Sequence, residues 1–147
     1  MCIYLSLEKQ LNINNNLLCI GITAIDLSTN NIYIHEAIST QYDKTYATDE
    51  TNRIINSLDP NEILIYYEKE EIQEYIKYIN IDKKKAIFFK QVDQKYKKII
   101  FQNEFLKMTF QNNIKSFIAP IELLNIEKNI YVTTSLCLII DYVNDKN

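Results

Sequence analysis

Glycine is almost missing from this sequence, which holds one glycine (Gly21) and two prolines in 147 residues. At the usual frequency of about 7%, roughly ten glycines would be expected. A Walker phosphate loop needs two glycines and a dinucleotide-binding turn needs three, because the backbone must approach a phosphate where a Cβ would collide. The composition therefore excludes a nucleotide site of either kind within this chain.

Arginine is nearly as scarce, with 15 lysines accompanied by Arg53 alone and a net charge of -3. Arginine is the residue that most often donates two parallel hydrogen bonds to a guanine edge or to a phosphate. Its scarcity therefore argues against sequence-specific DNA recognition. A length of 147 residues with 47% hydrophobic residues indicates one globular domain spanning residues 1–147.

The sequence also lacks a cysteine pattern, since Cys2, Cys19 and Cys137 lie far apart with no metal-ligand or disulfide spacing. This favours a reducing intracellular compartment and argues against a metal site. The N-terminus has no basic start followed by a long apolar core, so we expect no signal peptide. The longest uncharged apolar run, residues 131–140, is too short to cross a bilayer, and we expect no membrane partner.

Strand-forming residues dominate the first quarter of the chain. Residues 2–7 alternate loosely, and residues 17–27 are nearly all apolar, which is typical of a central strand covered on both faces. A polar loop over residues 8–16 joins them. Asparagine tolerates positive φ, so residues 28–31 predict a turn that leads into a third strand over residues 32–38. We expect an antiparallel meander.

The apolar spacing then becomes helical. Asp43 is expected to cap a helix that ends at Asp59-Pro60-Asn61. Its inward face is predicted to comprise Ala47, Thr51, Ile54, Ile55 and Leu58. The elements expected next are a strand over 63–67, a helix over 69–79, a strand over 86–89, a helix over 96–110, a short helix beginning at Pro120 and a helix over 130–143.

The predicted order β-β-β-α-β-α-β-α indicates an α/β protein. Right-handed crossovers that follow an antiparallel meander give a five-stranded mixed sheet, of order 3-2-1-4-5, with helices on both faces. This is the ribonuclease-H-like architecture.

Several segments resemble the connector domain (domain II) of the MutS family of DNA mismatch repair proteins. The run GITAIDLST at 21–29, followed by Ile32-Tyr33, is similar to a strand and hairpin of that domain. Three further segments match. The first is a helix-to-strand junction that includes Glu50, Arg53 and residues 59–65, the second is residues 124–127, and the third is the closing helix at 131–142. Residues 102–106 resemble a segment of the giant-virus and octocoral mitochondrial branch, and the similarity covers about residues 1–144.

The resemblance implies a non-catalytic connector that relays conformational change between mismatch-binding and ATPase domains and offers a surface to a MutL-like partner. It also implies no cofactor in this domain, with ATP and Mg²⁺ bound elsewhere in a DNA-dependent ATPase. The chain lacks a Walker loop and a Phe-x-Glu mismatch-reading motif, so we expect an excised domain of a larger protein. Gly21 then falls in a buried strand, where a side chain would crowd a neighbouring element.

The alternative hypothesis is a metal-dependent nuclease, because ribonuclease-H-like folds often carry one. Such enzymes need an Asp in the first strand and further carboxylates that converge on two metal ions. The first strand, residues 2–7, has no carboxylate. The remaining candidates are Asp26, Glu50, Glu68 and Asp141. Of these, Asp26 is better explained as the anchor of the hairpin turn.

Other polar residues carry weaker hypotheses. The only histidine, His35, is interpreted as a solvated or hydrogen-bonded strand residue, because no nucleophile or metal cluster accompanies it. Residues 83–98 contain seven lysines and one acid, Asp93. Lys95, Lys97 and Lys98 are the candidate phosphate-contacting surface, suited only to weak, non-specific DNA contact, and a solvated charged segment is the other interpretation.

The helix predicted over residues 96–110 is rich in aromatic residues on more than one face. These are Tyr96, Phe101, Phe105 and Phe110. We favour core packing, together with an exposed patch that a neighbouring domain covers, over stacking with a single-stranded nucleic acid.

Overall fold

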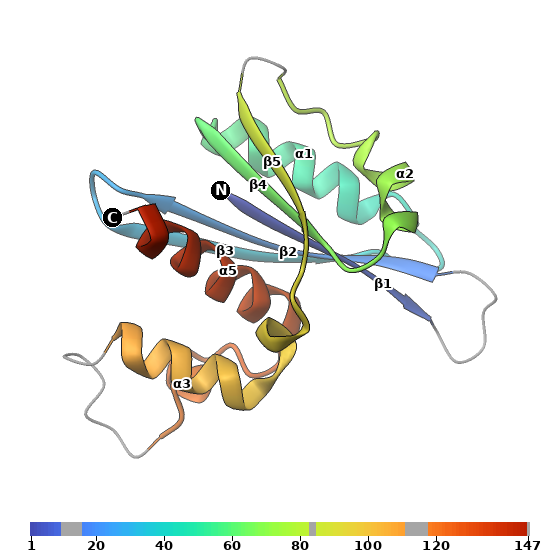
Figure 1. The fold of residues 1–147 in the computed structure, drawn as a ribbon. Coiled ribbons are helices and arrows are strands. Elements are labelled where there is room, and N and C mark those ends of the chain that lie inside the picture. Colours follow the sequence, from blue (N-terminus) through green and yellow to red (C-terminus); the bar gives the residue numbers. More distant parts are fainter. Residues whose placement is uncertain (10–15, 83–84, 111–117, 147) are drawn as a thin grey trace.

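The computed structural model describes residues 1–9, 16–82, 85–110 and 118–146 (Figure 1). Its five strands form one sheet in the order β3-β2-β1-β4-β5, as predicted. The strands are β1 (Cys2–Lys9), β2 (Asn16–Asp26), β3 (Asn31–Ile38), β4 (Glu62–Tyr67) and β5 (Ala86–Gln91). The β1–β2 and β2–β3 pairs are antiparallel, and the β1–β4 and β4–β5 pairs are parallel. The mixed, ribonuclease-H-like sheet is therefore confirmed.

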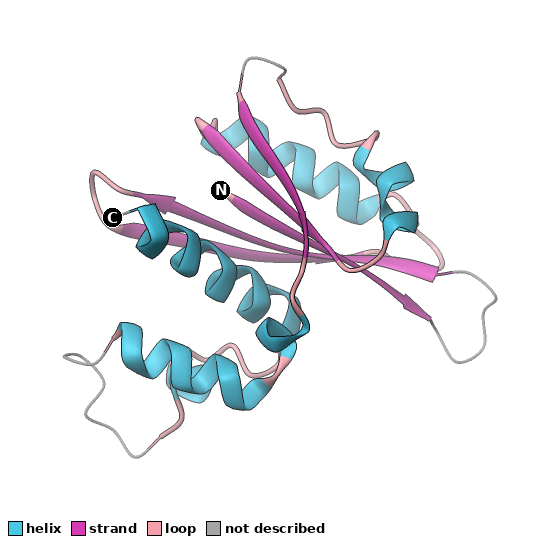
Figure 2. Cartoon of the chain, in the orientation of Figure 1, coloured by secondary structure: helices cyan, strands magenta, loops and turns pink. Residues whose placement is uncertain are grey.

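Helices lie on both sides of this sheet, with α1 and α2 on one side and α3 and α5 on the other (Figures 1 and 2). The described helical elements are α1 (Tyr46–Leu58), η1 (Glu70–Ile72), α2 (Gln73–Ile76), η2 (Gln94–Lys97), α3 (Ile99–Thr109), α4 (Pro120–Leu123) and α5 (Ile130–Lys146). Pro120 occupies the first turn of α4, where its missing N–H has no intrahelical partner to lose. None of the described helices combines the length and apolar character that a membrane span requires.

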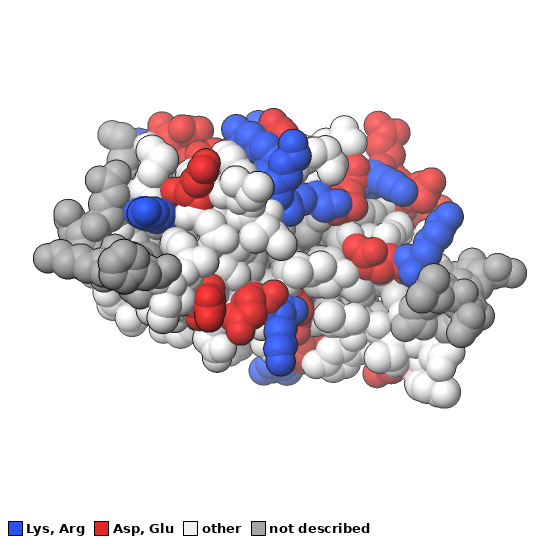
Figure 3. All heavy atoms as spheres, turned by 90° about the horizontal axis from the view of Figure 1, so that it is seen from below, with Lys and Arg blue, Asp and Glu red and all other residues white. Residues whose placement is uncertain are grey.

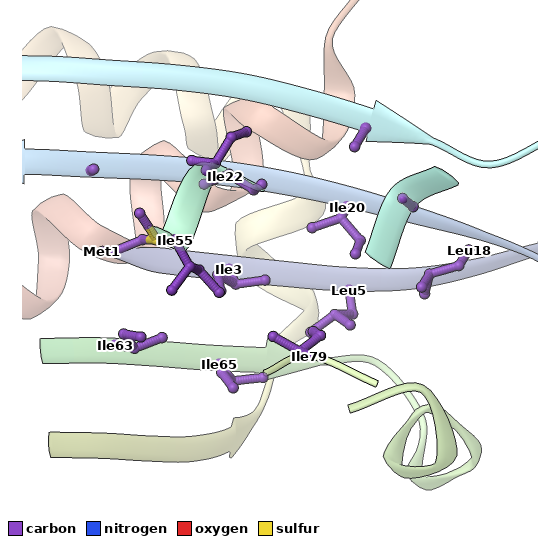
Figure 4. Packing of buried hydrophobic residues seen from close by; sticks show 14 of the residues in the cluster. Met1, Ile3, Leu5, Leu18, Ile20, Ile22, Ile55, Ile63, Ile65 and Ile79 are labelled. Atoms are coloured by element: carbon purple, nitrogen blue, oxygen red, sulfur yellow. The ribbon is translucent and has the colours of Figure 1, made fainter. Parts of the chain in front are cut away.

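Two hydrophobic cores form because successive side chains of a strand point to opposite faces. In β1, Ile3 and Leu5 face α1, and Cys2 and Tyr4 face α5. Figure 4 shows the first core, in which isoleucines and leucines from β1, β2 and β4 interdigitate with Ile55 of α1. The two cores make the sheet the rigid centre of the molecule.

Helix α5 is buried around its whole circumference. Every residue from Val132 to Ile140 is buried, because the sheet packs on one side of the helix and the layer containing α3 packs on the other. The middle of α5 therefore lies inside the protein, and the hydroxyls of its buried polar residues, Thr133, Thr134 and Ser135, donate hydrogen bonds to backbone carbonyls. The N-terminal turn of α5 lies against Gly21, which confirms the predicted crowding at this residue.

The helix predicted over residues 69–79 is shorter and less regular in the structure, with helical turns only over residues 70–76. The structure has only η1 and the four-residue α2 there, followed by a tight turn whose bonds run from the amides of Tyr78 and Ile79 to the carbonyls three residues earlier. The Asn52 side chain, from α1, donates to the Tyr78 carbonyl and accepts from the Asn80 amide. These tertiary bonds favour a turn over a continued helix.

Four further details of the prediction were also wrong. Helix α1 begins after Thr45, and Asp43 does not cap it. Leu58, predicted to point inward, is exposed in the last turn of α1. The helix predicted over 96–110 is divided, because Lys98 is extended between η2 and α3. The loop predicted over residues 8–16 overlaps the last two residues of β1 and the first residue of β2, and its residues 10–15 lie outside the described part of the chain.

Candidate interaction surfaces

The carboxylates that the nuclease hypothesis requires have separate local partners. Asp26 accepts hydrogen bonds from the Ser28 amide at 2.9 Å and from the Ser28 hydroxyl at 2.6 Å. These bonds hold the pKa of Asp26 below its usual value. Asp26 thus anchors the β2–β3 turn, as predicted.

Glu50 belongs to a charged cluster on the α1 side of the sheet. The Arg53 guanidinium donates to it from Nε at 2.9 Å and from Nη2 at 2.6 Å, which lowers the pKa of Glu50. His35 Nε2 lies 3.2 Å from Glu50 Oε1, an ion-pair distance, although this buried nitrogen has no hydrogen-bond partner among the described residues. His35 is therefore a partly exposed strand residue beside a carboxylate.

Glu68 and Asp141 lie on the α5 side, and each accepts a hydrogen bond from a tyrosine. Tyr4 donates to Glu68, and Tyr96 donates to Asp141. Lys97 Nζ also lies 2.6 Å from Glu68. Burial is the main cause that raises the pKa of both tyrosines, and the hydrogen bond to the neighbouring carboxylate is the second. Both tyrosines therefore remain protonated donors.

These carboxylates do not assemble into a metal site. Across residues 1–9, 16–82, 85–110 and 118–146, no three His, Cys, Asp or Glu side chains are grouped so that they could hold a metal ion. A nuclease of this architecture would need a carboxylate in the middle of β1, where this chain places Tyr4. The geometry gives the nuclease hypothesis no support.

The three cysteines are separate buried thiols. Burial raises the pKa of Cys2 and of Cys137 to about 12, so neither is a thiolate near neutral pH. Both side chains act as small hydrophobic groups in the core beside α5.

The candidate phosphate-contacting lysines cluster on and just after η2. Lys95 Nζ lies over the rings of Tyr96 and Phe101, 4.9 and 5.6 Å from their centroids. Lys97 is paired with Glu68, and Lys98 is exposed immediately before α3. The structure therefore leaves Lys95 and Lys98 more available to an external anion than Lys97. Two other lysines of the basic segment, Lys83 and Lys84, lie outside the described residues.

The aromatic residues near α3 serve mainly as core. Tyr96 is buried and meets Phe101 edge-to-face at 5.3 Å, and Phe101 stacks on Phe105 at 5.8 Å. The large hydrophobic side chains exposed on α3 are not aromatic: Ile99, Ile100 and Met108 are 65%, 76% and 68% exposed. Figure 3 shows the molecule from below the view of Figure 1, with uncharged side chains across its middle and charged groups around them. Three large apolar side chains exposed on one helix are typical of a surface that another element covers.

Glu36 is a structurally important residue that sequence reasoning missed. Its carboxylate accepts hydrogen bonds from the amides of Tyr131 and Val132, at 3.0 and 3.2 Å, and thereby caps α5. The nearer of these partners is 95 residues away in sequence, so no local pattern identifies the contact.

The sheet order, the helices on both faces and the two-sided core define an α/β protein with ribonuclease-H-like architecture. No family model matches the chain. Along its entire length, however, the chain is similar to a DNA mismatch repair protein mutS homolog of Acanthamoeba polyphaga mimivirus, with 30% identity over 168 residues. The chain spans 15% of that relative's length. This similarity supports a MutS-family domain.

Proposed function

We propose that the chain is a non-catalytic connector module of a MutS-like DNA mismatch repair protein. It relays conformational change between mismatch-binding and ATPase domains, and it offers a surface for protein contacts. One observation carries this proposal: the whole chain matches 15% of a far longer mutS homolog. A domain-sized unit of such a protein, in which the carboxylates have separate partners, suits a mechanical role better than a chemical one.

The packing of the fold suits the transmission of movement. Both faces of the sheet are covered, and α5 is enclosed between the sheet and the α3 layer. Close-packed cores do not deform continuously, so a displacement at one surface moves the whole unit. ATP and Mg²⁺ would be bound by other parts of the parent protein. A phosphate-binding loop needs several glycines, and the single glycine of this chain, Gly21, lies in contact with the start of α5.

The exposed apolar residues of α3 provide a contact surface for a neighbouring domain. A MutL-like protein is a second partner class that this module would meet. Lys95 and Lys98 add, at most, weak contact with a nucleic-acid backbone, because isolated lysines carry no sequence information.

Binding in trans tests the domain contact. The mimivirus mutS homolog would be produced without the segment that this chain matches, and the purified chain would be titrated into it. Binding is expected, and Ile100→Lys should weaken it roughly tenfold, or about 1.4 kcal/mol. Leu27→Lys is the matched control, because Leu27 is 69% exposed on the distant β2–β3 turn. Absence of binding, or an equal loss in both variants, would contradict this part of the proposal.

Activity assays separate the connector from the nuclease alternative. The purified chain should neither hydrolyse ATP nor cleave DNA or RNA/DNA hybrids with Mg²⁺ or Mn²⁺. Cleavage that Asp26→Asn abolishes would favour the nuclease.

A further inference from the structure

A cavity of about 280 Å³ lies on the α5 side of the sheet and plays no part in the proposed connector role. Aromatic rings from four elements line it: Tyr66 from β4, Phe88 from β5, Tyr96 from η2 and Tyr142 from α5. In the register of the sheet, Leu64 pairs with Phe88 and Tyr66 with Lys90, so these side chains share one face. The lining of the cavity thus comes from β4, β5, η2 and α5 together with residues next to them in the chain.

The rings at the edge of this cavity already contact an ammonium group of the chain itself. Lys146 Nζ lies 4.6 Å from the centroid of Tyr142 and 5.6 Å from that of Phe88. Contacts within about 6 Å are favourable cation–π interactions, because the ring face carries negative charge. Lys146 Nζ is ion-paired with Glu62 Oε1 at 2.8 Å, and neither residue is among those that line the cavity. Two of the rings that line the cavity, those of Tyr142 and Phe88, thus already take part in cation–π contacts, with an ammonium group that is not itself part of the lining.

The cavity wall also carries excess negative charge. Asp141 and Asp145 lie four residues apart on α5, and both line the cavity. Asp141 accepts a hydrogen bond from Tyr96. Within the described part of the chain, Asp145 has no ion pair or side-chain hydrogen bond, and Lys90, the cation of the wall, pairs with neither aspartate.

We propose that this cavity binds an organic cation, an ammonium group at the end of a short carbon stem. Aromatic faces and a carboxylate together are the chemistry that recognises quaternary ammonium groups and methylated lysine. The volume suits a small head group, since typical sites for drug-sized ligands begin near 300 Å³. The cation can come from a free small molecule or from a lysine side chain on a protein, and the two sources share this chemistry.

The experiment is an NMR titration of the full chain with choline chloride at constant ionic strength. Its control ligand is 3,3-dimethylbutanol, which has the same shape without the charge. Choline should shift the resonances of Tyr66, Phe88 and Tyr142, and the neutral alcohol should bind roughly tenfold more weakly or not at all. Equal binding of the two ligands, or shifts elsewhere in the protein, would overturn the proposal.

Variants test whether the named residues carry the binding. Asp145→Asn and Phe88→Leu should each weaken choline binding by roughly fivefold, the equivalent of about 1 kcal/mol. Asp145 is exposed, so Asp145→Asn remains informative even if Phe88→Leu impairs folding. Glu74→Gln removes the same charge from α2, on the other side of the sheet, and should leave binding unchanged. Unchanged binding by Asp145→Asn, or an equal loss by Glu74→Gln, would overturn the proposal.

Peptides identify the source of the cation. A short peptide with one trimethyllysine is compared with the same peptide carrying alanine at that position. Stronger binding of the first peptide than of choline assigns the cavity to a protein side chain. Binding of choline alone assigns it to a free small molecule, and either result supports the cavity as a cation site.

Discussion

Gly21 lies directly against the Tyr131 carbonyl, at the start of α5. A Cβ on Gly21 would be 2.1 Å from the Tyr131 oxygen and 2.7 Å from the Val132 amide nitrogen, well inside van der Waals contact. Its cross-strand neighbour is Glu36, whose carboxylate binds the amides of Tyr131 and Val132. One glycine and one glutamate, side by side on β2 and β3, therefore fix where α5 begins on the sheet.

Replacing Gly21 should be costly. Gly21→Ala would force α5 away from the sheet or distort β2, and we expect the free energy of unfolding to fall by about 3 kcal/mol. Urea denaturation measures the change. Ser57→Thr adds one carbon at an exposed position of α1 and should change stability by less than about 0.5 kcal/mol. An unchanged midpoint for Gly21→Ala would refute the close approach.

Removing the charge of Glu36 should weaken the start of α5. Glu36→Gln keeps the shape of the side chain but loses the negative charge at the helix N-terminus, and a loss of about 1 kcal/mol is expected. Hydrogen exchange should accelerate first at the amides of Tyr131 and Val132. Glu104→Gln, on the exposed surface of α3, is the control. Equal effects of the two variants would show that Glu36 does not cap α5.

Stability should decline in acid because two glutamates ionise more readily in the folded state. Arg53 lowers the pKa of Glu50 below 4.5, and Lys146 and then Tyr142 do the same for Glu62. Between the unfolded and folded pKa values the unfolded chain binds more protons, so this contribution is present above about pH 4.5 and is lost as the pH falls through the folded values.

The pH dependence can be measured by denaturation between about pH 7 and pH 3. The double variant Glu50→Gln with Glu62→Gln should be less stable at neutral pH and should show a flatter decline in acid. Glu71→Gln with Glu74→Gln removes two exposed carboxylates of η1 and α2 as a control. A decline as steep in the first variant as in the unmodified chain would assign the acid sensitivity to other groups.

The lysines after β5 should contribute unequally to any nucleic-acid contact. Fluorescence anisotropy with a single-stranded oligonucleotide at varied salt should show weak binding at low salt only. Changing Lys95, Lys97 and Lys98 to Gln together should reduce the salt slope by about two. Lys97→Gln alone should change it less than Lys98→Gln, because Glu68 already holds Lys97. Absence of binding at low salt would remove DNA from the partners of this chain.

The features of the fold that depend on neighbouring residues in the chain could be predicted from the sequence. The β2–β3 turn follows from Asp26 and from Asn30, whose φ is 59°. The two-sided burial of β2 follows from its continuous apolar run. A close approach of some neighbouring element to Gly21 was predicted from the resemblance, and the structure shows that this element is α5.

Features set by distant residues could not be predicted in this way. The side chain of Asn52 stabilises the turn at residues 78–80, so the helical spacing before it does not continue as a helix. The partners of the candidate-site residues are also remote in sequence. Tyr4 meets Glu68 only when β1 pairs with β4, and Tyr96 meets Asp141 only when η2 packs against α5. The exposure of Ile99 and Ile100 likewise depends on the position of α3 in the outer layer.

The measurement that tests the connector role most directly uses a chimera of the mimivirus mutS homolog in which this chain replaces the segment it matches. The quantity measured is the stimulation of ATP hydrolysis by mismatched DNA over matched DNA. The account predicts that the chimera keeps this stimulation. A chimera with a flexible Gly-Ser linker of equal length should hydrolyse ATP but lose the stimulation, and Gly21→Ala should reduce it. Equal stimulation in the linker chimera would show that no rigid connector is needed and would contradict the account.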